Sequence, residues 1–124
     1  MNSSSKLLAL AEQDLDNAQL LLENDRYRAA VSRAYYAMYY GTQALLDNKK
    51  IASRTHKGMI QQFGQHFVKT GDFSTDISKR LSDTYDLRQM SDYESDAVID
   101  KEVAEKAITA SIDFVAEVRA YFTK

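Results

Sequence analysis

The chain has 124 residues, of which 44% are apolar and 27% charged, with a net charge of −2 and no Pro, Cys or Trp. This length suits a single domain, residues 1–124, and the lack of cysteine excludes a disulfide framework, a thiolate metal site and a cysteine nucleophile. No apolar run approaches the roughly 18 residues of a membrane span, and the first residues lack the features of a signal peptide, so we expect a cytoplasmic protein with no membrane contact.

Apolar residues recur at helical spacing and predict five helices, with no strand alternation. We place the first at residues 5–24, with a serine as its N-cap, and the second at residues 25–47. The third spans residues 53–70 and stops at Gly71; the fourth starts near Ser74, and an acidic turn at residues 91–96 precedes a fifth that opens at Asp100. Helices joined by short loops pack antiparallel, so the sequence predicts an all-α, up-and-down bundle.

The second predicted helix carries two kinds of side chain in regular rows. Small residues at helical spacing allow a neighbouring helix to approach closely; they are Ala30, Ala34, Ala37 and Gly41. Beside them run two tyrosine stripes, Tyr35 with Tyr39 and Tyr36 with Tyr40. These stripes are typical of core and dimer packing, and the alternative is a platform on which nucleic-acid bases stack.

Several common kinds of chemistry lack their residues in this sequence. The four glycines stand apart, so there is no glycine-rich phosphate loop. His56 and His66 lie on different faces of the third predicted helix, and neither a zinc-hydrolase His pair nor the Glu-x-x-His pattern of di-metal bundles occurs. We therefore expect no metal and no cofactor.

Arg88 stands in line with the apolar stripe of the fourth predicted helix, and Asp92 follows one turn later. A guanidinium in such a position costs free energy unless it is paired or faces an interface. One interpretation is an ordinary Arg88–Asp92 ion pair, worth about 0.2–0.5 kcal/mol if exposed. The other is an anion site at a junction between subunits.

His56 lies in the first turn of the third predicted helix, between Arg54 and Lys57. It falls within residues 48–88, where eight Lys or Arg face four Asp or Glu, and the segments on either side are acidic. A helix N-terminus beside two cations favours an anion. The alternatives are a half-buried structural histidine and, for the basic segment, ordinary solvated helix faces.

Three segments together resemble HEPN-domain proteins, in particular the small stand-alone prokaryotic group. They are the tyrosine-rich run Tyr27–Tyr40, the run Thr55–Gly58 followed by Gln62–Gly64, and the segment Leu87–Tyr93. The similarity extends from the first predicted helix to Phe122. It implies an all-α bundle that forms a homodimer and places two copies of an arginine motif face to face.

The resemblance also implies a function. Many HEPN domains are metal-independent endoribonucleases that act as toxins, and many are encoded beside a minimal nucleotidyltransferase that neutralises them. Their motif is an Arg followed four to six residues later by a His. In some members a Tyr stands two residues after that His, and the partner enzyme modifies it with AMP.

This chain matches the motif in part, because Arg88 is followed by Asp92 instead of a His, and Tyr93 comes directly after. One hypothesis is a ribonuclease in which Arg88 binds the scissile phosphate while Asp92, Tyr93 and His56 handle protons. A second is a non-catalytic module that binds the nucleotidyltransferase, a nucleotide or RNA. A third is a structural dimer held together by Arg88–Asp92 pairs. The sequence leaves enzymatic activity open among these.

Overall fold

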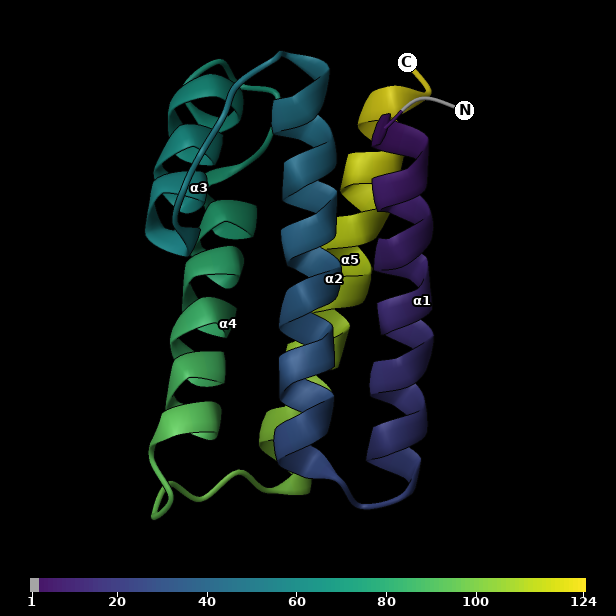
Figure 1. Ribbon diagram of the computed structural model, residues 1–124, viewed down its shortest axis with the longest axis vertical. Helices are drawn as coiled ribbons and strands as arrows, with labels where there is room; N and C mark the ends of the chain where they lie inside the picture. The colour runs from purple at the N-terminus through teal and green to yellow at the C-terminus, as the bar shows by residue number, and fades with distance from the viewer. Residues whose placement is uncertain (1–2) are drawn as a thin grey trace.

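The computed structural model describes residues 3–124, which form five α-helices and one π-helical turn (Figure 1). The helices are α1 (Ser3–Glu23), α2 (Tyr27–Asn48), α3 (His56–Phe63), α4 (Thr75–Tyr93) and α5 (Lys101–Phe122), and the π-turn η1 (Gly64–Val68) follows α3. Long helices run up and down the molecule, and both ends of the described chain lie at one end of the bundle. The predicted all-α bundle is confirmed. The serine N-cap predicted for the first helix is wrong, because the helix begins earlier than predicted and Ser3, Ser4 and Ser5 all lie within α1.

Helix α2 is the centre of the bundle and packs against the other four helices. Its predicted row of small residues is fully buried, as the exposures of Ala30, Ala34 and Ala37 show. A Cβ atom placed on Gly41 would lie 3.5 Å from Val118 and 3.7 Å from Phe114, so α5 approaches α2 closely at this point. The small side chains therefore do what their spacing predicts.

The core is different in character at its two ends. At the end that holds α3, it is rich in aromatic rings, including Tyr35, Phe63, Phe67 and Phe114. At the other end, short side chains of α1, α2 and α5 pack together; they are Ala18, Leu22, Ala30, Val31, Ala34, Ala104, Ala107 and Ile108. The predicted tyrosine stripes contribute to the aromatic end, with ring centroids 6.5 Å apart for Tyr35–Tyr39.

The connection between α2 and α3 reverses the chain at once. Lys50 adopts a left-handed conformation (φ 59°), Lys50 N–H donates to Asp47 O, and Ile51 N–H donates to Leu46 O. These paired hydrogen bonds close a Schellman turn, which ends a helix sharply. In Figure 1 the connecting coil then runs back along the bundle, so that α3 starts beside the middle of α2.

The third predicted helix, residues 53–70, is wrong at both ends. Thr55 is extended (φ −131°, ψ 159°) and its hydroxyl accepts a hydrogen bond from Gly58 N–H, so the helix starts at His56. After Phe63 the turn widens, and Lys69 N–H donates to Gly64 O five residues earlier. Gly71, the predicted stop, has a φ of +85°, a conformation that suits glycine, but it lies in the turn beyond η1, which ends at Val68.

The acidic turn predicted at residues 91–96 is also partly wrong, because α4 continues to Tyr93. The reason lies on α2, where the Arg28 side chain donates hydrogen bonds to the carbonyl oxygens of four residues: Ser91, Glu94, Ser95 and Ala97. In return, Ser91 Oγ donates to Arg28 O at 3.3 Å. This Arg28 clamp supports the last turn of α4 and fixes the loop after it.

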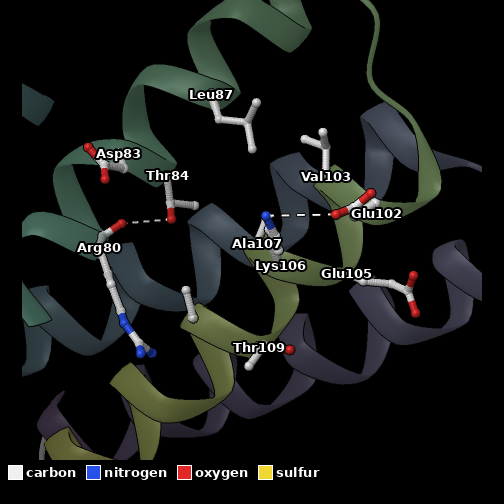
Figure 2. Close-up of a pocket in the computed structure, with 11 residues that line it drawn as sticks. Arg80, Asp83, Thr84, Leu87, Glu102, Val103, Glu105, Lys106, Ala107 and Thr109 are labelled. Atoms are coloured by element: carbon white, nitrogen blue, oxygen red, sulfur yellow. Dashed lines mark hydrogen bonds and ion pairs between the residues drawn. The ribbon is translucent and has the colours of Figure 1, made fainter.

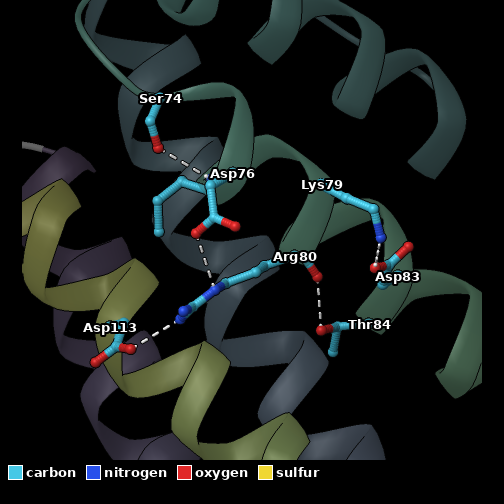
Figure 3. A network of polar contacts seen from close by, with 8 residues as sticks. Ser74, Asp76, Lys79, Arg80, Asp83, Thr84 and Asp113 are labelled. Atoms are coloured by element: carbon cyan, nitrogen blue, oxygen red, sulfur yellow. Dashed lines mark hydrogen bonds and ion pairs between the residues drawn. The ribbon is translucent and has the colours of Figure 1, made fainter.

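A groove of about 710 Å³ lies between α4 and α5 (Figure 2). Leu87, Val103 and Ala107 line it, and a Glu102–Lys106 ion pair sits on its rim. The guanidinium of Arg80, which also lines the groove, lies 2.8 Å from the carboxylate of Asp113 on α5 and 3.3 Å from that of Asp76 on α4 (Figure 3). An ion pair thus joins the two helices beside the groove.

Candidate functional site

Arg88 lies on α4 at the edge of the aromatic core. Ile77, Leu81 and Tyr85 form one buried stripe, as predicted, and Arg88 continues it with a side chain only 13% exposed. The guanidinium lies over the ring of Tyr36, with Cζ 5.2 Å from the ring centroid, within the range of a cation–π contact. A largely buried cation is therefore held against aromatic rings.

The contacts of the Arg88 guanidinium leave part of it free. One terminal nitrogen donates to Gln89 Oε1 at 2.9 Å, and the other donates to the Tyr36 hydroxyl at 3.0 Å. Nε lies 2.8 Å from Asp92 Oδ2, in an ion pair whose angle does not make a directed hydrogen bond. Because a guanidinium has five N–H groups, each terminal nitrogen keeps one that no group within residues 3–124 accepts.

Both carboxylate oxygens of Asp92 have partners on neighbouring residues. One carboxylate oxygen pairs with Arg88, and the other accepts a hydrogen bond from Ser32 Oγ at 2.8 Å. The ordinary ion pair that the sequence predicts at this position is therefore formed. Tyr93 lies beside it with its side chain largely in solvent, 71% exposed, and its ring centroid 5.9 Å from Arg88 Cζ.

His56 is the first residue of α3 and faces the tyrosines of α2. Its Nδ1 lies 2.6 Å from the hydroxyl oxygen of the fully buried Tyr35, and its ring stacks on Tyr85 at 5.9 Å. Burial, and then the charge of Arg88, lower the pKa of His56, which keeps the imidazole neutral at pH 7. Burial likewise raises the pKa of Tyr35, so its hydroxyl stays protonated.

The structure brings His56 and Arg88 to one place, where both contact Tyr36. The His56 ring lies 6.2 Å from the Tyr36 ring, edge to face, and Arg88 binds the hydroxyl of the same tyrosine. We call the group of Arg88, Asp92, His56, Tyr35 and Tyr36 the Arg88 site. All four site residues predicted from the sequence lie at or beside the Arg88 site: Arg88, Asp92, Tyr93 and His56.

Sequence reasoning missed two residues that shape this site. Ser32 holds Asp92, and Arg28 holds the end of α4. Both belong to the tyrosine-rich run, but a serine and an arginine on one helix give no sign of which distant segment they contact. Tyr36 was placed in a stripe for packing, and its hydroxyl bond to Arg88 depends on the tertiary fold.

Two further observations concern the described part of the chain, residues 3–124. It contains no group of three or more His, Asp or Glu side chains arranged to hold a metal ion. None of its helices combines the length and apolar character needed to cross a membrane.

The fold and site define a small helical-bundle protein with a half-buried arginine–aspartate pair beside a neutral histidine. A family model described as the HEPN domain matches residues 4–121. The chain therefore belongs to the HEPN domain family, and the resemblance seen in its sequence is confirmed.

Similar proteins agree with this assignment. Two are from Methanocaldococcus jannaschii: "Putative toxin MJ0142" is 33% identical over 94% of this chain and 79% of its own, and "Putative toxin MJ0605" is 36% identical over 91% and 84%. Among solved structures, TT1696 from Thermus thermophilus is 17% identical, with a TM-score of 0.83 over 98% of this chain and 99% of its own. At that identity the likeness shows the fold alone.

Proposed function

We propose that this chain is the toxin component of a toxin–antitoxin pair and that it cleaves RNA without a metal ion at the Arg88 site. Two similar proteins carry the name "Putative toxin", and the resemblance to metal-independent HEPN endoribonucleases implies the chemistry. The observation that carries the proposal is the meeting of His56 with Arg88 on Tyr36. A histidine from another helix thereby compensates for the one missing after Arg88.

The reaction divides between these two residues. The 2′-oxygen of the ribose attacks the adjacent phosphorus and its proton passes to His56 Nε2. The bond from phosphorus to the 5′-oxygen then breaks, and that oxygen takes up the proton, leaving a 2′,3′-cyclic phosphate and a 5′-hydroxyl. The free N–H groups of Arg88 bind the phosphate oxygens and stabilise the charge that develops on them.

Tyr35 orients the histidine for this role. A base needs Nε2 without a proton, so the proton of neutral His56 must sit on Nδ1 and be donated to the Tyr35 oxygen, 2.6 Å away. The same bond then supports the imidazolium that forms during the reaction. Asp92 has a different task, because both of its oxygens are occupied: it holds Arg88 in place.

The test is cleavage of a transfer-RNA pool with EDTA present throughout. We expect the wild-type protein to cut and both Arg88→Ala and His56→Gln to lose at least about 100-fold in rate, since each removes a group that acts in the transition state. His66→Gln is the matched control and should cut like wild type. Undiminished cleavage by Arg88→Ala or by His56→Gln contradicts the proposed site.

We also propose that the protein acts as a homodimer with a minimal nucleotidyltransferase as its antitoxin. Supporting this, exposed apolar side chains gather around the end of α4 and the loop after it: Met90, Tyr93 and Val98, which are 40%, 71% and 83% exposed. Large apolar groups left in solvent beside a site favour a protein partner. Analytical ultracentrifugation of the protein alone tests the homodimer, and ultracentrifugation of a mixture with the nucleotidyltransferase tests the complex.

A specific observation favours a second candidate, a non-catalytic binding module for the nucleotidyltransferase, a nucleotide or RNA. Arg88 and Asp92 neutralise each other at 2.8 Å, which weakens the pull on a phosphate. If this module is a degenerate nuclease, Asp92→His should create or raise cleavage. If Asp92→His stays inert, and the wild type is inert but binds RNA, the binding module is favoured and catalysis is excluded.

A further inference from the structure

One long segment of the chain is positively charged and contains no acidic residue. Between Asp47 and Asp72 there is no Asp or Glu, while Lys49, Lys50, Arg54, Lys57 and Lys69 are all present and exposed. The ion pairs found in residues 3–124 all involve other residues. These five cations thus have no carboxylate partner in the described chain, whereas Arg33, Arg80 and Arg88 do.

The segment reaches the Arg88 site at His56. The Schellman turn after α2 sends the coil back along the bundle to the start of α3 (Figure 1). In the sequence, Arg54 and Lys57 flank His56 at this helix start. The hydroxyl of Thr55 serves Gly58 N–H, and the amides of His56 and Lys57 remain among the donors that a helix start leaves unpaired. Two cations and two amide donors therefore lie close together along the chain at the start of α3.

A small cavity of about 60 Å³ lies at the same place. It is lined by His56, Arg54, Thr55, Tyr39, Gln43 and Ser53. Ser53 Oγ is buried and makes no hydrogen bond, although a buried hydroxyl normally has a partner. Both Arg54 and Lys57 are exposed, and the proposed chemistry uses neither of them.

The geometry points to a phosphate-binding subsite at Ser53, Arg54 and Lys57, which holds an RNA phosphate next to the one at Arg88. This inference rests on the proposed function, which names RNA as the substrate. The subsite binds the backbone and not a base, because its groups are cations, amides and a hydroxyl. It sets where the strand lies across His56, and the lysines further along the segment extend the path.

The experiment separates binding from cleavage. The probe is a labelled RNA oligonucleotide of mixed sequence with every 2′-hydroxyl methylated, which lacks the attacking group and is not cut. Its dissociation constant is measured by fluorescence anisotropy over a series of salt concentrations for wild type and for Arg54→Gln/Lys57→Gln. The control is Lys101→Gln/Lys124→Gln, which removes the same charge from exposed lysines at the ends of α5.

We expect Arg54→Gln/Lys57→Gln to bind about 10-fold more weakly and to flatten the slope of log affinity against log salt by about 0.7 for each phosphate that the variant no longer binds. The control should keep the wild-type slope. An unchanged affinity and slope in the Arg54/Lys57 variant overturns the subsite, even if the wild type cuts unmethylated RNA. Binding that depends on Arg54 and Lys57, in a wild type that cuts nothing, supports the subsite and contradicts the proposed nuclease.

Discussion

At the scale of single residues, the Arg88 site shows how a charge is kept at the edge of a core. The guanidinium is 13% exposed, and burial of an unpaired charge there would cost several kcal/mol. Asp92, Gln89 and two tyrosine rings compensate for the lost water. In this arrangement Asp92 positions Arg88 and does not act as a free base. A substitution of Asp92 therefore also changes the position of the Arg88 side chain.

His56 should make stability depend on pH in one direction. Its pKa in the folded protein lies below the ordinary value of 6.5, so the unfolded chain takes up the proton first as the pH falls. The contribution of His56 to the free energy of unfolding is therefore greatest above about pH 6.5. It decreases as the pH falls below about 6.5 and stops changing once the pH is below the lowered pKa.

Urea unfolding at a series of pH values, compared between wild type and His56→Gln, measures this contribution. The wild type should lose stability relative to His56→Gln as the pH falls from about 7.5 to about 5.5, because only the wild type carries that proton linkage. His66 and the carboxylates are common to both proteins and cancel. Parallel curves would contradict the lowered pKa.

At the scale of elements, the start of α2 and the end of α4 form one unit through the Arg28 clamp. One side chain binds four backbone oxygens, and Ser32 one turn further along α2 holds Asp92. The position of the site thus depends on α2 for support as much as on α4 for its arginine.

Replacing Arg28 should loosen this unit. We expect Arg28→Ala to destabilise the protein by about 1–3 kcal/mol, because several carbonyl partners lose their donor together. Arg28→Lys should rescue little, since a single ammonium cannot reproduce the planar fork. Urea unfolding gives the loss, and amide exchange in residues 94–97 should quicken. The exposed Arg26→Ala serves as the control; an equal loss there would speak against the clamp.

At the scale of the whole molecule, the sequence determines the bundle well and the site in part. Periodicity located the helices, because each buries one face against α2, and Arg88 stood out because it continued an apolar stripe. The approach of His56 to Arg88 could not be predicted, because it depends on the path of residues 49–55. The π-turn after Phe63 was missed for a similar reason, since a one-residue change in hydrogen bonding leaves no mark in the apolar pattern.

The close packing of α5 against α2 can be tested at Gly41. Space exists for one methyl group, with its nearest neighbours at 3.5 Å and 3.7 Å, so Gly41→Ala should stabilise the protein by up to about 1 kcal/mol through helix propensity. Gly41→Leu should destabilise it by about 1–3 kcal/mol, because α5 would have to move. Thermal and urea unfolding measure both; a destabilising alanine would mean that α2 and α5 lie closer than described.

The Arg28 clamp has a consequence for how such a protein changes over time. Arg28 binds the loop after α4 through backbone carbonyl oxygens, which every amino acid possesses. These hydrogen bonds do not depend on which side chains the loop carries. Substitutions in that loop alter the surface shown to a binding partner and leave the course of the backbone as it was. If the proposed antitoxin binds this loop, the two proteins can change their contact side chains together while the backbone of the loop keeps its course.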